Sequence, residues 1–314
     1  MRHTPALALA LTATLALAAC GGGGDPLATD ADSPTPDQGS ATDAAGEGGE
    51  GGEVIVGSAN FPENVLLAEI YAAALSDAGV DVTTRLNIGS REAYMAGLED
   101  GSIDLIPEYI GGLATYLNPE ITVTSSEEVL AEAQENLPEG LQLLEASEAE
   151  NKDSLVVTRE TADELGLTAI GDLEAHAGDL ALGGPPEFES RPNGVDGLRE
   201  TYGLEFGEFR SLAAGSNLTV QALRNGQVDV ANIFTTDPAI EENDFVVLED
   251  PESLFAAQNI VPLITDDVVN QAVEDALNEV SAALNTENLT AMMVEVVSEG
   301  QDPADVARTF VDEM

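Results

Sequence analysis

Residues 96–104 read Ala-Gly-Leu-Glu-Asp-Gly-Ser-Ile-Asp, and residues 221–229 repeat the pattern as Gln-Ala-Leu-Arg-Asn-Gly-Gln-Val-Asp. Each segment is typical of a helix end, a glycine that stops the helix, and a strand that begins with Ile or Val before Asp. An aromatic residue, Tyr109 or Phe234, stands five positions after each aspartate. The shared landmarks indicate a diverged internal repeat.

A matching glycine upstream extends the repeat. Gly57 and Gly183 lie in similar apolar runs and precede the two aspartates by 47 and 46 residues. Around both copies, short apolar runs alternate with helix-like segments such as residues 64–78, which favours an α/β fold with mostly parallel sheets. We therefore expect two lobes of one plan. Because open α/β sheets bind ligands at the carboxyl ends of their strands, a ligand would lie in the cleft between them.

The N-terminal segment predicts an exported, lipid-anchored protein. A charged start precedes the apolar residues 5–16, and Leu-Ala-Ala-Cys ends at Cys20, the only cysteine of the chain. This pattern is typical of a secretory signal and is too short for a membrane span. We expect a lipoprotein signal peptide over residues 1–19 and lipidation of Cys20. The alternative is an ordinary signal peptide with a chance cysteine.

The remaining composition separates a linker from a folded body. Residues 20–53 are rich in Gly, Asp, Ser, Thr and Pro, so they are predicted to form a disordered tether. Residues 54–314 are enough for two lobes. The chain carries 59 acidic and 10 basic residues, and the acidic residues are spread through the body. Such a field repels nucleic acid and anionic lipid headgroups, so we expect neither as a partner.

The sequence offers little for catalysis. Its two histidines are His3, in the signal segment, and His176, so they provide no imidazole pair for a metal or a catalytic triad. The single cysteine excludes a disulfide framework and a cysteine-based metal site in the body. No phosphate loop or nucleophile elbow follows a predicted strand. We expect no enzyme activity, no cofactor and no metal, and we favour a solute receptor that closes on its ligand.

Several strings resemble the substrate-binding proteins of osmoprotectant ABC importers, the glycine betaine/carnitine/choline class. Residues 57–63 read Gly-Ser-Ala-Asn-Phe-Pro-Glu, and residues 104–111 read Asp-Leu-Ile-Pro-Glu-Tyr-Ile-Gly. Further matches lie at residues 187–194, 201–204, 221–223 and 235–237. The resemblance covers essentially all of the body in order.

This resemblance implies a two-lobed periplasmic-binding-protein fold of type II. It implies two crossovers between the lobes and a ligand cleft between them. Lobe I would combine residues 54–154 with residues 260–314, and lobe II would comprise residues 155–259.

The resemblance also implies ligand-binding residues. Family members hold a quaternary ammonium in an aromatic cage, usually of tyrosines, by cation–π attraction. Tyr109 matches a cage tyrosine, and Phe234 stands where a second tyrosine is usual. Arg191 matches the arginine that grips the ligand carboxylate. Asp153 and Glu187 match acidic positions, and Glu187 either positions Arg191 or contacts the ligand.

The chain departs from the family pattern at other positions. Leu155, and Gln258 or Asn259, replace cage aromatics. Ala59 stands where a lysine is common, and Gly112 where a threonine often donates a hydrogen bond. The pocket therefore resembles a betaine site with fewer rings and more hydrogen-bonding groups. The further polar contacts expected are those of Asn60, Asp153, Thr235 and Asn259. The ligand is either a weakly bound glycine betaine or a larger zwitterion, such as a betaine of an aromatic amino acid.

Five of these residues also have structural interpretations. Tyr109 fits a strand end with a satisfied hydroxyl, and Phe234 fits the core. Arg191 fits a surface salt bridge. Asp153 fits a hinge turn, and Asn60 fits a helix N-cap.

The resulting functional expectation is an extracytoplasmic substrate-binding protein, anchored by lipid to the outer face of the cytoplasmic membrane. It would capture a small zwitterion by lobe closure and deliver it to an ABC permease and its ATPase, and we expect a monomer. Two alternatives remain open at this point, a receptor domain that signals instead of feeding a permease and an enzyme.

Overall fold

The computed structural model describes residues 52–314. The predicted signal peptide, the lipidation of Cys20 and nearly all of the predicted tether lie outside the described residues.

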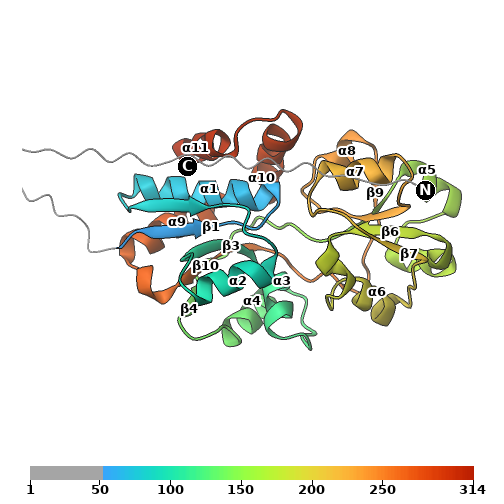
Figure 1. The fold of residues 1–314 in the computed structure, drawn as a ribbon, viewed down its shortest axis with the longest axis horizontal. Coiled ribbons are helices and arrows are strands. Elements are labelled where there is room, and N and C mark those ends of the chain that lie inside the picture. The colour runs from blue at the N-terminus through green and yellow to red at the C-terminus, as the bar shows by residue number, and fades with distance from the viewer. Residues whose placement is uncertain (1–51) are drawn as a thin grey trace, which may run out of the picture. The chain divides into compact units, whose positions relative to one another are not determined.

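Two five-stranded sheets organise the described chain (Figure 1). The first has the strand order β2-β1-β3-β10-β4. Its strands are β1 (Val54–Gly57), β2 (Val82–Arg85), β3 (Leu105–Tyr109), β4 (Leu141–Leu143) and β10 (Ile260–Thr265). The second has the order β7-β6-β8-β5-β9. Its strands are β5 (Leu155–Val157), β6 (Ala181–Gly184), β7 (Glu208–Ser211), β8 (Val230–Asn232) and β9 (Val246–Val247).

The two sheets share one topology. In the first, β1 runs parallel to β2 and β3, and β10 runs antiparallel to β3 and β4. In the second, β6 runs parallel to β7 and β8, and β5 runs antiparallel to β8 and β9. Each sheet thus has three parallel strands and two added on one side. The α/β architecture in two lobes of one plan, predicted from the repeat, is confirmed.

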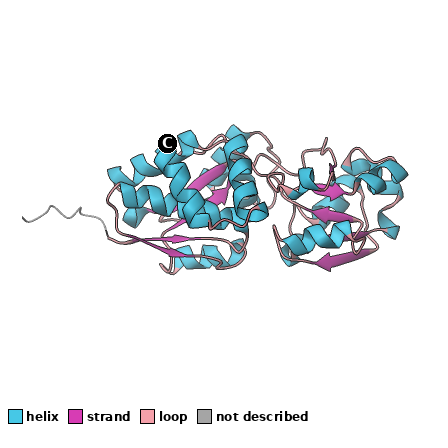
Figure 2. Ribbon diagram, turned by 90° about the horizontal axis from the view of Figure 1, so that it is seen from above, coloured by secondary structure: helices cyan, strands magenta, loops and turns pink. Residues whose placement is uncertain are grey.

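Helices cover both faces of each sheet (Figure 2). Around the first sheet they are α1 (Pro62–Asp77), α2 (Arg91–Glu99), α3 (Ile110–Leu117), α4 (Ser126–Glu135), α9 (Gln271–Ala283), α10 (Thr286–Met293) and α11 (Pro303–Glu313), with short turns of helix at Asp266–Val268 and Val294–Ser298. Around the second sheet they are α5 (Arg159–Leu165), α6 (Val195–Tyr202), α7 (Asn217–Arg224) and α8 (Ala239–Glu242), with 3₁₀ turns at Ile170–Ala175, Ala177–Asp179 and Pro186–Glu189.

Alternation along the strands divides the core into layers. In β10, Ile260 and Ile264 pack with α1, α9 and α11, whereas Val261 and Leu263 pack with α2, α3 and α4. Successive side chains of a strand point to opposite faces, so one strand serves both layers. In the second lobe, Val156 packs with α7 and α8, and its neighbours on β5 pack with α5 and α6.

The repeated aspartates have one structural role in both lobes. Asp104 accepts a hydrogen bond from the backbone N–H of Ile55 on its Oδ2, at 2.8 Å. Asp229 accepts the equivalent bond from Ala181, also at 2.8 Å. The backbone N–H of Asp104 donates in return to the carbonyl of Ile55, and that of Asp229 donates to the carbonyl of Ala181. Asp104 therefore ties the start of β1 to the segment that leads into β3, and Asp229 ties the start of β6 to the segment that leads into β8.

The two repeated glycines stand where neighbouring side chains leave no room for a Cβ atom. A Cβ at Gly57 would lie 2.7 Å from Cδ1 of Ile103, and a Cβ at Gly183 would lie 3.1 Å from Cγ1 of Val228. Ile103 and Val228 are the apolar residues before the two aspartates. The glycine and the apolar residue of each copy therefore form one close contact, which accounts for their nearly constant separation.

The chain passes between the sheets twice, once between β4 and β5 and once between β9 and β10. The lobe limits expected from the family resemblance, at 154/155 and 259/260, stay a prediction. Residues 125–128 read Ser-Ser-Glu-Glu, a pattern typical of a capping box, but no such box forms at the start of α4. A capping box would need a bond between the Ser125 side chain and the helix backbone. Instead, Ser125 Oγ donates to Oε2 of Glu128 at 2.5 Å.

Candidate ligand-binding cleft

One cleft is lined by residues of both lobes. From the first lobe and the crossing segments come Ala59, Asn60, Phe61, Ser90, Arg91, Tyr94, Tyr109, Gly112, Asn151, Asp153 and Gln258. From the second lobe come Pro185, Glu187, Phe188, Arg191, Asn193, Ala214 and Phe234. Tyr109 ends β3, and Phe234 follows the equivalent strand β8. The cleft therefore lies at the strand ends where the repeat predicted a site.

Six of the eight residues predicted to bind the ligand lie in this lining. They are Tyr109, Phe234, Arg191, Asp153, Asn60 and Glu187. Their roles in binding stay a prediction. Asn60 is exposed and does not cap α1, because the N-cap position belongs to Phe61 and has no side-chain cap.

The other two predicted residues do not line the cleft. Thr235 is exposed, and its hydroxyl accepts a hydrogen bond from the Lys152 backbone at 3.0 Å. Asn259 donates from Nδ2 to the Ser147 carbonyl at 3.0 Å and accepts from the Ser126 hydroxyl at 2.6 Å. Both side chains serve local structure at the crossings.

The aromatic residues of the cleft form a row with Phe61 in the middle. The ring centroids of Phe61 and Tyr109 are 6.0 Å apart, with the ring planes inclined at 33°. The Phe61 and Phe234 centroids are 5.2 Å apart, with the planes at 45°. Both distances lie in the range of favourable aromatic pairs. Phe61 was not predicted as a site residue, although it stands inside the quoted string at residues 57–63.

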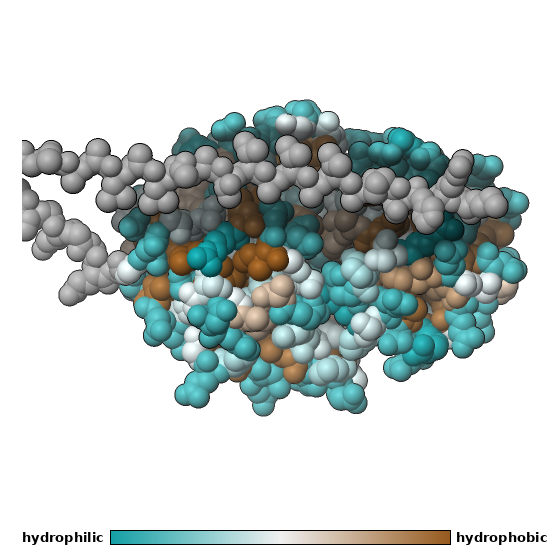
Figure 3. Space-filling view, viewed as in Figure 1, coloured by the Kyte–Doolittle hydropathy of each residue, from teal (hydrophilic) through white to brown (hydrophobic). Residues whose placement is uncertain are grey.

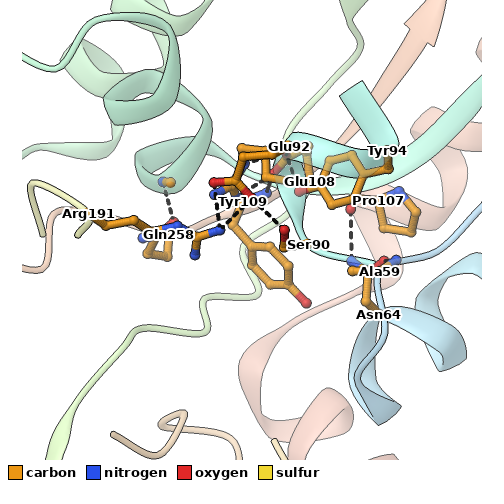
Figure 4. A network of polar contacts seen from close by, with 12 residues as sticks. Ala59, Asn64, Ser90, Glu92, Tyr94, Pro107, Glu108, Tyr109, Arg191 and Gln258 are labelled. Carbon is orange, nitrogen blue, oxygen red and sulfur yellow. Dashed lines mark hydrogen bonds and ion pairs between the residues drawn. The ribbon is translucent and has the colours of Figure 1, made fainter. Parts of the chain in front are cut away.

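A buried ion pair supports the first-lobe side of the cleft. Arg91 donates from Nε and Nη2 to the two carboxylate oxygens of Glu108, at 2.7 and 2.8 Å. The Tyr94 hydroxyl and the Tyr109 backbone N–H also donate to this carboxylate, each at 2.7 Å. Figure 4 shows Tyr94, Glu108 and Tyr109 in this network. Sequence reasoning missed Arg91 and Glu108, because their pairing depends on the fold.

The ion pair with Glu108 keeps Arg91 positively charged. Burial alone would lower the pKa of Arg91, but the Glu108 carboxylate outweighs burial and raises that pKa above its usual value. Arg91 therefore brings a fixed cation to the wall of the cleft.

Glu63 is a second buried carboxylate, and it joins three parts of the chain. It accepts hydrogen bonds from the Tyr109 hydroxyl at 2.7 Å, from Asn151 Nδ2 at 2.6 Å, and from the Thr236 hydroxyl. These partners lie on β3, on the first crossing and after β8. Burial raises the pKa of Glu63, although the hydrogen bonds from Thr236, Tyr109 and Asn151 oppose the rise. Burial also raises the pKa of Tyr109 well above its usual value, so its hydroxyl remains a donor.

Two other charged groups of the cleft, Arg191 and Asp153, are less tightly held. Arg191 Nη2 reaches across to the Glu92 carboxylate at 3.4 Å (Figure 4). Asp153 accepts one hydrogen bond, from Asn232 Nδ2 at 3.0 Å. Its pKa is raised by burial, which outweighs the Asn232 bond and the nearby Arg191. Glu187 lines the cleft beside them.

Two positions where the family resemblance placed cage aromatics differ in environment. Leu155 is fully buried in the core of the second lobe. Gln258 lines the cleft, and its Oε1 accepts a hydrogen bond from the Gly112 backbone N–H at 2.9 Å.

Figure 3 shows one face on which hydrophilic residues predominate and apolar residues are scattered. Within residues 52–314, no cluster of three or more His, Cys, Asp or Glu side chains is arranged to hold a metal ion. In the same part of the chain, no helix combines the length and the apolar character needed to cross a membrane.

Comparison with known proteins gives consistent matches. Residues 52–313 match the family OpuAC, described as the substrate binding domain of ABC-type glycine betaine transport systems. A glycine-betaine-binding protein of Pseudomonas aeruginosa is 30% identical over 272 residues, covering 82% of this chain and 86% of that protein. An ergothioneine transport permease/ergothioneine binding protein of Helicobacter pylori strain G27 is 22% identical over 266 residues, covering 83% of this chain and 47% of that protein.

A solved structure supports the fold. The crystal structure described as a glycine betaine/carnitine/choline ABC transporter aligns with a TM-score of 0.66 at 23% identity, covering 83% of this chain and 98% of that one. The two-lobed binding-protein fold expected from the sequence is therefore confirmed.

Proposed function

Because this chain belongs to the OpuAC family of substrate-binding domains of ABC-type glycine betaine transport systems, we propose that its cleft captures a betaine, a quaternary ammonium compound that carries a carboxylate. Glycine betaine is the first candidate. One observation carries this proposal: a row of aromatic rings from both lobes lies in the same cleft as two arginines.

The cationic end of a betaine suits the aromatic and acidic groups. A trimethylammonium group cannot donate an N–H hydrogen bond, so it is held by ring faces and by negative charge. Each ring contributes about 0.5–2 kcal/mol, depending on desolvation. Phe61 and Phe234 supply ring surface from opposite lobes, and Asp153 adds a partly buried carboxylate.

The anionic end suits the arginines. Arg191 and Arg91 both line the cleft, from different lobes. A guanidinium group can bind a carboxylate through two parallel N–H bonds. A ligand with charges of both signs would satisfy both sides of the cleft, whereas a simple cation would leave the arginine donors unused.

Lobe closure would complete the capture. Arg191 and Glu92 already meet across the cleft, as do the Phe61 and Phe234 rings. We expect the ligand to stabilise this contact and the closed protein to dock on an ABC permease coupled to its ATPase. The predicted anchor at Cys20 would keep a monomeric protein at the outer face of the cytoplasmic membrane.

A larger zwitterion is the second candidate. Leu155 leaves the second lobe without the ring that the family resemblance placed there, and Gln258 offers a polar group instead. The name of the Helicobacter pylori relative indicates that a related sequence recognises ergothioneine, a bulkier betaine. This candidate keeps the fold and the capture mechanism and changes the substrate.

Isothermal titration calorimetry tests the proposal with purified protein and glycine betaine, choline, carnitine, proline betaine and ergothioneine. We expect a betaine to bind, with Phe234→Ala weakening the affinity about 2- to 30-fold, the loss of one ring. Tyr116→Ala is the matched control, because Tyr116 is 41% exposed and lies outside the cleft lining. Binding of ergothioneine alone would select the second candidate. No binding of any compound would contradict the proposed function.

A further inference from the structure

We propose that Arg91 is the fixed anchor for the ligand carboxylate, and that it sets a preference for betaines over choline. Glu108 positions this anchor, and Gly112 leaves the space that it occupies. The inference rests on the proposed function, because it assigns one end of the proposed ligand to a residue that neither the repeat nor the family resemblance selected.

The hydrogen bonds of Arg91 point to a missing acceptor. A guanidinium group has five N–H donors. Arg91 uses one on Nε and one on Nη2 to bind Glu108. Within residues 52–314, Nη1 makes no hydrogen bond, so three N–H groups remain without a partner in the protein. The side chain is 10% exposed and lines the cleft. Buried donors are generally satisfied, and here the cleft is where an acceptor can reach them.

The carboxylate of Glu108 fixes the plane of that guanidinium. The carboxylate accepts two bonds from Arg91, one from the Tyr94 hydroxyl and one from the Tyr109 backbone. It is fully buried. The bidentate pairing restricts rotation of the arginine fork. The unused edge of the fork is therefore preorganised before any ligand arrives, which reduces the ordering cost of binding.

Gly112 is needed for this placement. A Cβ built at Gly112 would lie 2.6 Å from Nη2 of Arg91, 2.9 Å from Nη1 and 3.0 Å from Cζ. Gly112 lies within α3 and does not have a positive φ, so its backbone does not require glycine. The absence of a side chain at position 112 is what admits the guanidinium to the wall of the cleft.

The two arginines of the cleft differ in a way that divides their roles. Arg191 has a side chain that is 26% exposed and makes one long contact, with Glu92. Arg91, in contrast, donates to the Glu108 carboxylate through both Nε and Nη2. Arg91 would receive the carboxylate first, and Arg191 would add to it from the other lobe. Choline has no carboxylate, so it would bind while leaving the Arg91 donors unsatisfied, which is unfavourable.

Two variants test this assignment by calorimetry with glycine betaine and choline. Arg91→Lys keeps a cation for Glu108 and removes the guanidinium fork. Gly112→Ala keeps Arg91 and displaces its fork. We expect each variant to bind glycine betaine about tenfold more weakly or worse, as for a lost charge-assisted hydrogen bond. Choline affinity should stay within about twofold, so the betaine-to-choline preference falls. Arg224→Lys, on α7 outside the cleft lining, is the surface control.

The outcomes separate this inference from the proposed function. Circular dichroism and thermal melting first establish which variants are folded, and either variant suffices. If a folded variant keeps the wild-type preference, or loses both ligands equally as a structural defect would cause, the role of Arg91 is overturned while the proposed function stands. If the wild-type protein binds no betaine, the proposed function fails and this inference fails with it.

Discussion

In the first lobe, the polar groups behind the cleft are buried and bonded several times, whereas the second lobe presents groups that are half-buried and bonded once. Glu108 accepts four hydrogen bonds and Glu63 accepts three. On the opposite side, Arg191 makes a long contact with Glu92, and Phe234 is only partly buried. We therefore propose that the first lobe is a preformed half-site and that the second lobe completes binding.

This difference separates stability from affinity. Substitutions that leave buried groups of the first-lobe network unpaired should lower the free energy of unfolding, and at Arg91 alone they should also weaken betaine binding. Substitutions of second-lobe residues should mainly lower ligand affinity. Variants that compare the two halves directly can break or sharpen this distinction.

The largest difference in the loss of unfolding free energy is expected between variants of the two cleft arginines. Arg91→Met leaves the Glu108 carboxylate buried without its cation and should lower the free energy of unfolding by about 3–5 kcal/mol. Arg191→Met removes a partly exposed contact and should cost about 1 kcal/mol or less. Urea unfolding followed by circular dichroism measures both. Equal losses for the two variants would contradict the distinction between a preformed and an adaptable half.

Tyr109 allows the hydroxyl and the ring to be separated. Tyr109→Phe removes one of the donors to Glu63 and should cost about 1–3 kcal/mol of stability. Because the ring remains beside Phe61, betaine affinity should change little. Phe234→Ala should show the reverse pattern, with reduced affinity and a smaller loss of stability. Unfolding and calorimetry on the same samples make the comparison, and a large affinity loss in Tyr109→Phe would contradict it.

Glu63 should give the protein a pH-dependent stability. Its pKa is raised above 4.5 in the folded state, so between the unfolded and folded pKa values the native state binds more protons. The free energy of unfolding therefore falls as pH rises through that interval. Glu63→Gln should remove this contribution and leave the protein relatively more stable at neutral pH. Each tenfold difference in proton affinity between the folded and unfolded states corresponds to about 1.4 kcal/mol.

Thermal melts of wild type and Glu63→Gln at a series of pH values upward from the ordinary carboxyl pKa of 4.5, above which the pKa of Glu63 is raised, measure this effect. Asp237→Asn is the comparison variant, because burial also raises the pKa of Asp237, whose charge adds to the rise at Glu63. If the melting temperatures of wild type and Glu63→Gln change with pH in the same way, Glu63 does not titrate as described.

The smallest loss of stability is expected for the two repeated aspartates, and it should be equal in the two lobes. Asp104→Asn and Asp229→Asn keep an oxygen acceptor for the backbone N–H that each aspartate binds. Each should cost about 1 kcal/mol or less, with similar values because the two environments are equivalent. Urea unfolding of both variants checks the equivalence of the repeat. A loss confined to one lobe would show that the two copies have diverged in energetics as well as in sequence.

The fold was predictable from sequence because its determinants are local and repeated. The glycine stop, the apolar residue and the aspartate that follows it lie within a few positions of each other and occur twice. Their hydrogen bonds have the same geometry in both copies. The repeat also indicated the sheet-end location of the cleft, and the family strings indicated the class of fold.

Six of the eight predicted residues line one cleft, and that lining also contains residues that were not predicted. No local pattern marks Arg91 as a site residue, and only the fold brings Glu108 beside it. Glu63 and Thr236 are far apart in the chain but share a hydrogen bond. No local pattern identifies such pairs. Gly112 was interpreted as the loss of a donor, whereas the structure shows that it makes room for one.

Two predicted residues missed the cleft by one position. Thr235 and Asn259 were expected to face the ligand, whereas their neighbours Phe234 and Gln258 line the cleft. Neighbouring residues in extended backbone point to opposite sides, so an error of one position moves a side chain out of the site. Motif matching alone does not determine that alternation at the crossings.

A crystal structure of the protein with glycine betaine is the most direct test of a ligand held between a preformed and an adaptable half. We expect the trimethylammonium group beside Phe61 and Phe234 and the carboxylate within hydrogen-bonding distance of Arg91, so that both lobes contact one ligand. A betaine bound by one lobe alone, or outside this cleft, would contradict it.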